Sequence, residues 1–221
     1  MKNKSMNKPE NAGKLSLSNN PGSNTSGHRK SNFLLKSINF LIILLIAGGV
    51  YVSAQDGARL VSEKSHIRFF SSTPAEDIEA HNYSATSTLD KTSGNVAFSV
   101  PMQGFEFDKR LMQRHFNQDG YLDTQQYPTA RLVGKITNLE DIDFSQNGSY
   151  DAVIEGELTI KGITNDIKEK GTITVNGSRV TAESVFQVTL ADYGIVFTSG
   201  RPASNIAGTI EVTVNAEYQP Q

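Results

Sequence analysis

The longest regular feature of the sequence is an alternation of apolar and polar residues over residues 151–175. In its first half, one face carries small or aliphatic side chains: Ala152, Ile154, Gly156, Leu158 and Ile160. The other face is mostly polar and includes Glu155 and Glu157. A period of two is typical of a half-buried antiparallel strand and not of a helix. Because the alternation breaks near Lys161 and Gly162 and then resumes, it predicts two long strands joined by a short turn, a β-hairpin.

Shorter alternating runs on both sides of this hairpin predict further strands. They cover residues 58–61 and 65–71 (one broken strand or two), 82–89, 96–102, 130–136, 180–190 and 206–216. In the run 82–89 the alternation places Tyr83 on the same face as Ala85 and Leu89. Seven or eight long strands with turn signals between them, and no regular alternation of strands with helices, predict an all-β fold, a closed antiparallel barrel of about eight strands, since closure removes exposed strand edges. A two-sheet sandwich is the alternative, and the length of the strands favours the barrel.

Residues 108–116 interrupt the strand pattern. Leu111, Met112, His115 and Phe116 recur at helical spacing behind Asp108, a residue type that can cap a helix. The sequence therefore predicts one short helix near one end of the barrel.

The predicted inner face of the barrel is apolar. The inward positions outside the irregular first strand are read as containing no Asp, Glu, His, Lys or Arg, and many are small: Ala85, Ser87, Gly134, Gly156, Gly171, Ala182, Ser184 and Gly208. An eight-stranded barrel is either filled by its own side chains or holds one small ligand. The small residues favour an apolar cavity. The alternative is that the glycines only bend strands at barrel corners.

The expected ligand-binding residues are the larger apolar side chains of the inner face and of segment 105–116. They are Phe69, Phe98, Phe105, Phe107, Leu111, Met112, Phe116, Leu132, Ile154, Leu158, Phe186 and Ile210. Segment 105–116 combines aromatic side chains with a flexible methionine where the strand pattern stops, which suits a lid over a ligand of variable shape. The alternative is that the segment plugs the barrel end as ordinary core.

The N-terminal quarter of the chain differs in composition from the rest. Residues 1–32 are rich in Ser, Asn, Gly and Lys and have almost no apolar residues, so they are predicted to be disordered. Residues 33–54 combine a basic flank, an apolar core and the small residue Ala54, the pattern of a secretory signal cleaved after Ala54. An uncleaved membrane anchor is the alternative, although the apolar run is short against the roughly 18–20 residues of a membrane span. Residues 55–221 would then form the exported domain.

The same two parts of the chain also differ in net charge. Residues 1–54 hold seven Lys and Arg and one acidic residue, whereas residues 55–221 hold 14 Lys and Arg and 22 Asp and Glu, so the net charges are +6 and −8. An acidic domain repels phosphate backbones, which argues against nucleic-acid binding. The chain has no cysteine, which excludes disulfides and a lipidated cysteine. Membrane contact is expected only through the N-terminal signal segment, and the oligomeric state is not predicted.

No catalytic or metal-binding pattern emerges from the polar residues. His66, His81 and His115 lack the spacing of metal-binding motifs, so surface or hydrogen-bonded histidines are the better interpretation. The acidic pair Glu155 and Glu157 falls on the outer face, where a solvated surface explains it better than acid–base catalysis. We therefore expect no enzyme activity, no metal and no cofactor.

Four segments carry a resemblance to a known family. They are SHIRF at 65–69, the run from Met112 through Phe116, Tyr121 and Tyr127-Pro128 to Ala130, GELTIKGIT at 156–164 and FQVTLADYGI at 186–195. Over residues 64–218 the chain resembles the YceI-like family of bacterial lipid-binding and polyisoprenoid-binding proteins. Lys109-Arg110 stands where many members carry an Arg-Asp pair, so no role of that pair is transferred here.

The resemblance implies a lipocalin-like antiparallel barrel that holds an isoprenoid chain or another amphiphilic lipid, in the periplasm or secreted. It implies no agreed catalytic residues. Three classes of function follow: an exported carrier of amphiphiles, an enzyme acting on a lipid or isoprenoid, and a structural or stress-interaction protein with a filled barrel. The uncharged inner face favours the carrier, whereas an enzyme would need a polar inward side chain.

Overall fold

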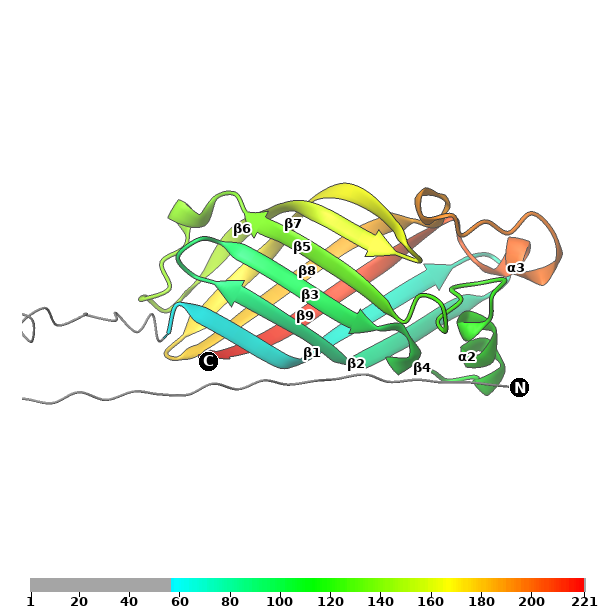
Figure 1. The fold of residues 1–221 in the computed structure, drawn as a ribbon, viewed down its shortest axis with the longest axis horizontal. Helices are drawn as coiled ribbons and strands as arrows, with labels where there is room; N and C mark the ends of the chain where they lie inside the picture. Colours follow the sequence, from blue (N-terminus) through cyan, green and yellow to red (C-terminus); the bar gives the residue numbers. More distant parts are fainter. Residues whose placement is uncertain (1–56, 221) are drawn as a thin grey trace, which may run out of the picture. The chain divides into compact units, whose positions relative to one another are not determined.

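The computed structural model describes residues 57–220, shown in colour in Figure 1. The strands are β1 (Arg59–Ser72), β2 (Asp77–Asp90), β3 (Asn95–Pro101), β4 (Phe105–Phe107), β5 (Thr129–Ile136), β6 (Gly148–Ile160), β7 (Ile163–Asn176), β8 (Arg179–Thr189) and β9 (Thr209–Pro220). The helices are α2 (Arg110–Asn117), α3 (Gly200–Asn205) and the short 3-10 helices η1 (Met102–Gly104), η2 (Leu139–Asp141) and η3 (Leu190–Tyr193). The predictions for residues 1–32 and 33–54, and for cleavage after Ala54, lie outside the described residues.

The strands form one antiparallel sheet that closes on itself. Neighbours follow the order β1-β9-β8-β7-β6-β5-β3-β2, and β1 also pairs with β2, which closes an eight-stranded barrel. The short strand β4 adds to β2 through three residue pairs. The predicted barrel is confirmed, and the two-sheet sandwich is wrong.

The predicted hairpin is the pair β6 and β7. Its ladder runs without interruption from Gly148 opposite Val175 to Ile160 opposite Ile163. The turn residues Lys161 and Gly162 both have positive φ, as a two-residue hairpin turn of type I′ requires. The inward residues predicted for β6 are buried or partly buried, so the register read from the alternation is the observed one.

Paired glycines set the distance between β5 and β6. Gly134 lies opposite Gly156, and a Cβ added to Gly156 would collide with the backbone carbonyl of Val133. A Cβ at Gly171 would lie 2.7 Å from the carbonyl oxygen of Glu183 on β8. At these positions glycine permits a close approach of two backbones, a role that differs from both the expected cavity space and the alternative of strand bending at barrel corners.

The first hairpin is less regular than the alternation suggested. β1 is one continuous strand whose register with β2 shifts between Ser62 and Ser65 and again before Ile67. Because of this irregularity Tyr83 is 53% exposed, while its neighbour Asn82 is fully buried. The Asn82 amide nitrogen donates to the carbonyl of Pro101 at 2.7 Å. The prediction that Tyr83 shares the inward face of Ala85 is therefore wrong, and Asn82 takes the inward position.

The helices α2 and α3 lie at the same end of the barrel (Figure 1). The predicted helix is α2, but its N-cap residue is Lys109 and not Asp108, and no side chain caps it by a hydrogen bond. A second helix, α3, was not predicted; it ends at Asn205, directly before the segment assigned to the last strand, and β9 begins at Thr209 and not at Ile206. Glu76 joins the two helical segments, since its carboxylate accepts from Lys109 Nζ at 2.6 Å and from Asn205 Nδ2 at 2.8 Å.

The opposite end of the barrel is closed by its own side chains. Leu60, Leu89, Ile136 and Tyr218 are each at most 1% exposed. A buried chain of hydroxyl groups accompanies them: Ser65 Oγ donates to Ser62 Oγ at 3.0 Å and lies 3.2 Å from Ser87 Oγ, which donates to Tyr218 Oη at 3.0 Å. Burial raises the pKa of Tyr218 to about 12. This end combines complete burial with satisfied polar groups.

Candidate ligand cavity

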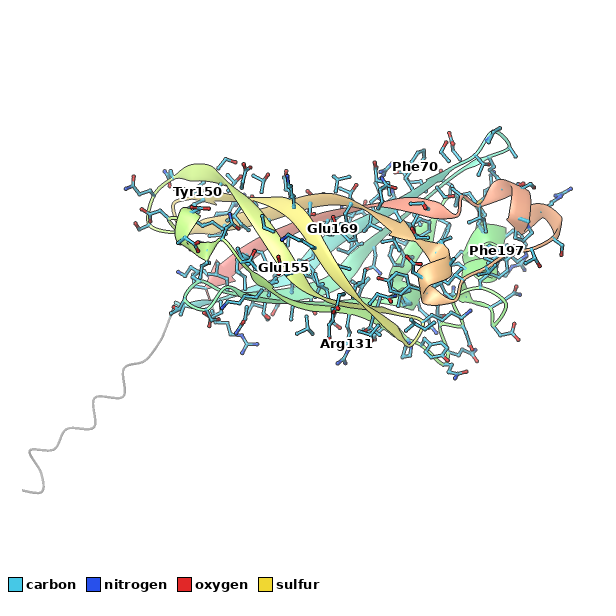
Figure 2. All side chains as sticks on the ribbon, turned by 90° about the horizontal axis from the view of Figure 1, so that it is seen from above. Phe70, Arg131, Tyr150, Glu155, Glu169 and Phe197 are labelled. Atoms are coloured by element: carbon cyan, nitrogen blue, oxygen red, sulfur yellow. The ribbon has the colours of Figure 1, made fainter. Side chains whose placement is uncertain are left out.

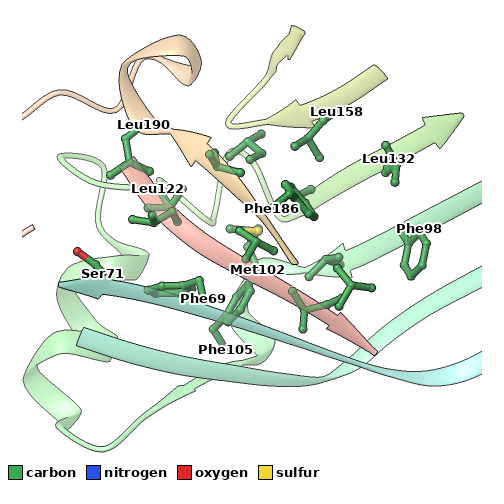
Figure 3. A pocket seen from close by; sticks show the side chains of 18 of the residues that line it. Phe69, Ser71, Phe98, Met102, Phe105, Leu122, Leu132, Leu158, Phe186 and Leu190 are labelled. Atoms are coloured by element: carbon green, nitrogen blue, oxygen red, sulfur yellow. The ribbon is translucent and has the colours of Figure 1, made fainter. Parts of the chain in front are cut away.

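A cavity of about 550 Å³ runs along the inside of the barrel. It extends from the end that carries α2 and α3 to Leu89, Ile136 and Tyr218 at the closed end. Its wall is mainly aliphatic and aromatic, because alternate residues of every long strand point inward (Figure 3). Volume and lining are those of a site for a small apolar ligand.

All twelve residues expected to bind a ligand line this cavity. From the strands come Phe69, Phe98, Phe105, Phe107, Leu132, Ile154, Leu158, Phe186 and Ile210, and from α2 come Leu111, Met112 and Phe116. Phe98, Phe105 and Leu158 are buried, whereas Leu111 at the open end is 52% exposed. The structure places these residues around one space. Their role toward a ligand remains a prediction.

Four phenylalanines form a cluster at the open end of the cavity. Phe69 lies 5.4 Å from Phe105 and 5.8 Å from Phe116, measured between ring centroids. Phe107 lies 5.2 Å from Phe116. Aromatic pairs at these separations attract one another beyond simple burial of area. Phe116 therefore anchors α2 to the barrel wall, while Leu111 on the same helix stays in solvent contact.

The rim of the open end is polar. Hydrogen bonds from Lys109 and then from Asn205 lower the pKa of the partly buried Glu76 carboxyl. His115 on α2 stacks on Tyr121 with a centroid distance of 5.6 Å. The open end therefore joins an apolar interior to polar side chains at the surface.

One carboxyl group faces the interior, and the sequence reading missed it. Glu169 shares the inward face of β7 with Ile167, Gly171 and Ile173 and lines the cavity. Burial raises its pKa. The expectation that the inward strand positions lack acidic residues is therefore wrong. A strict count of the alternation from Ile167 to Val175 would have identified Glu169.

Residues from loops complete the wall near the open end. Leu122, Ile195 and Phe197 line the cavity but belong to no strand. Ile195 and Tyr193 are buried and pack with Leu158 in a second apolar cluster. Burial raises the pKa of Tyr193, and the nearby charges of Asp192 and Glu169 add to the shift. Loop residues have no period, so the alternation carried no signal for them.

Two of the histidines lie on the outer face of the barrel. His66 Nε2 is 2.9 Å from His81 Nδ1, and His66 stacks on Tyr83. Burial lowers the pKa of His66, and the neighbouring His81 and Arg68 lower it further. Within residues 57–220, no group of three or more His, Asp or Glu side chains is arranged to hold a metal ion.

Comparisons with known proteins agree with this architecture. A polyisoprenoid binding domain from Saccharophagus degradans, implicated in plant cell wall breakdown, has a TM-score of 0.63 and 12% identity; the match covers 75% of this chain and 99% of that one. BcnA of Burkholderia cenocepacia has a TM-score of 0.57 and 18% identity over 69% of this chain and 95% of its own. At these identities the two structures support the fold alone.

Three further findings concern the sequence and its helices. A search of curated proteins gave no match. The helices within residues 57–220 are too short or too polar to cross a bilayer. The model of the YceI-like domain matches residues 59–218, which is well over half of the sequence. The chain belongs to the YceI-like family.

Proposed function

We propose that the protein is an exported carrier that holds an isoprenoid or another long amphiphilic lipid inside the barrel. The observation that carries this proposal is the apolar cavity of about 550 Å³ along the barrel interior. Burying apolar surface is worth about 25 cal/mol per Å², so such a wall binds apolar chains without specific polar contacts. The similar fold of a polyisoprenoid binding domain supports the same ligand class.

The two other classes of function fit the interior less well. A structural protein with a filled barrel would leave no space of this size. An enzyme would need a reactive group at the ligand, and Glu169 is the inward carboxyl that could supply one. Within residues 57–220, however, Glu169 has no hydrogen-bonded partner that would act as a nucleophile or second acid–base group. Binding without catalysis is the function that we propose.

Export is the second part of the proposal. Residues 33–54 have the pattern of a secretory signal, and residues 55–221 would act in the periplasm or outside the cell. N-terminal sequencing of the protein from its host is expected to give Gln55 as the first residue. A species that keeps residues 33–54 in the membrane fraction would replace the soluble carrier by an anchored one.

A chain-length series tests the carrier function. Each further buried methylene adds about 0.8 kcal/mol, so affinity for linear alcohols is expected to rise with length and then level off when the cavity is full. The matched variants are Ala182→Phe, which fills space on the inward face of β8, and Thr181→Phe on the outer face. Ala182→Phe should move the plateau to shorter chains, and Thr181→Phe should leave it unchanged. Equal affinity for all lengths would contradict the proposal.

A further inference from the structure

The barrel wall is incomplete between β7 and β8. The ladder between these strands joins only Gly171–Asn176 with Arg179–Ser184. On their other sides, β7 pairs with β6 from Ile163 to Val175, and β8 pairs with β9 from Val180 to Thr189. Among the described strands, residues 163–170 of β7 and 185–189 of β8 therefore have a partner on one side only.

Side chains mark both ends of this split. Where the ladder stops, Ser184 Oγ donates to the carbonyl of Lys170 at 2.6 Å and satisfies a backbone group that has lost its ladder partner. At the other end, the Asn165 amide nitrogen donates to the carbonyl of Asp192 in η3 at 2.9 Å. β7 is thus separated from β8 before Gly171 and paired with it from Gly171 onward, and the hydrogen bond of Asn165 connects the start of β7 to η3.

The cavity surface reaches this split. Ile167 and Phe186 line the cavity from the inner faces of the two separated segments. Thr172 and Glu183 also line it, although they lie opposite each other on the outer face of the ladder. The cavity lining therefore extends to the point where the ladder between β7 and β8 ends.

Glu169 lies at the end of the separated part of β7, two residues before the ladder with β8 begins at Gly171. Figure 2 shows it between the two barrel ends that Tyr150 and Phe197 mark. Its carboxylate forms no ion pair or hydrogen bond with another residue of the described chain, and burial alone accounts for its raised pKa. The adjacent Lys168 is directed to the outer face, where its Nζ lies 2.6 Å from Glu155.

We propose that the split between β7 and β8 holds the polar end of the bound amphiphile, and that Glu169 selects an end group that donates a hydrogen bond, such as a hydroxyl or a primary amide. This inference rests on the proposed carrier function and adds a specificity-determining residue to it. A partly buried carboxylate without a partner is costly, and a ligand donor at this point removes that cost. A permanently anionic end group would meet the charge of Glu169 at short range and be disfavoured.

The test compares three probes of equal chain length, hexadecanol, hexadecanamide and hexadecyl sulfate, on the purified protein. Competition against a fluorescent apolar probe gives each affinity. Wild type is expected to bind the alcohol and the amide at least about tenfold more tightly than the sulfate, the ratio that one charge-assisted hydrogen bond supplies. Glu169→Gln should bind the sulfate about tenfold more tightly than wild type does and lose most of this discrimination.

Controls separate end-group selection from chain binding. Glu157→Gln changes an outward carboxylate on β6 and should leave the order of the three probes unchanged. Displacement of the apolar probe by hexadecane should be the same in wild type and in Glu169→Gln. If the sulfate-to-alcohol ratio is equal in these two proteins while hexadecane still binds, the role of Glu169 is overturned and the carrier function stands. If no chain binds to wild type, the carrier function itself is overturned.

Discussion

The two ends of the barrel differ in how closely their side chains are packed. At the closed end, Leu89 and Tyr218 are almost completely buried, and hydroxyl groups satisfy one another in a chain that ends at Tyr218. At the open end, α2 is held by the aromatic contacts of Phe116, and Leu111 on the same helix is 52% exposed. The closed end contributes stability through close packing, whereas the open end leaves apolar surface accessible. Such a division suits a container that must be stable and must also exchange its contents.

The same substitution at the two ends should give the largest difference. Leu89→Ala removes a side chain that is 1% exposed and leaves a void, so we expect it to lower the free energy of unfolding by about 2–5 kcal/mol. Leu111→Ala removes a half-exposed side chain and should cost less than about 0.5 kcal/mol. Urea denaturation of both variants measures the difference. Equal losses would show that the open end is packed as tightly as the closed end.

Alkaline pH should weaken the closed end in particular. The pKa of Tyr218 is about 12 in the folded protein and about 10 in an unfolded chain. Its contribution to stability is fully present below pH 10 and is lost as the pH rises through 12, because only the unfolded state releases the proton readily. The free energy of unfolding should fall by about 1.4 kcal/mol per pH unit in this window, to a total of about 2.7 kcal/mol.

Tyr218→Phe is the control for this pH dependence. The variant keeps the ring and loses the titrating hydroxyl, and Ser87 retains Ser65 as a hydrogen-bond partner. Its stability should fall less steeply between pH 10 and 12 than that of wild type. Part of the slope will remain, since burial also raises the pKa of Tyr193. Identical slopes in the two proteins would show that Tyr218 ionises at its ordinary pKa in the folded state.

The smallest effect is expected at the polar rim of the open end. Lys109→Ala removes an ion pair with Glu76 in which the lysine side chain is 64% exposed. Exposed ion pairs contribute about 0–1 kcal/mol, and Glu76 keeps its hydrogen bond from Asn205. The melting temperature should therefore shift by no more than a few degrees, and it should shift less in high salt, where the wild-type pair is screened. A large, salt-independent loss would place Lys109 in the packing of α2.

The sequence predicted the parts of the fold that depend on local alternation. Ile154 and Leu158 point inward as expected, because the period of a strand fixes its faces wherever the pairing is regular. Tyr83 points outward because the register shifts between β1 and β2, and such a shift depends on the partner strand and not on the local pattern. The helix α3 was missed because its six residues, Gly200–Asn205, carry no apolar side chains at helical spacing.

The candidate site was predictable to a similar extent. Residues on strands were located by their period, whereas Ile195 and Phe197 come from a loop that only tertiary packing places at the cavity. The period of β7 also places Glu169 on the inner face, but an acidic residue there contradicted the apolar composition that was expected. The role of Gly134 and Gly156 was not predictable from their own strands, since the close backbone approach at these positions depends on how the two strands pair.

The unpaired segments of β7 and β8 also matter for self-association. A closed barrel normally has no free strand edge, and a free edge is a template on which a second molecule can add a strand. Lys168 stands on the free segment of β7 with its side chain 71% exposed, and a charged lysine on an edge opposes the approach of another chain. The opening in the wall therefore carries a risk of aggregation, against which this surface charge protects the protein at high concentration.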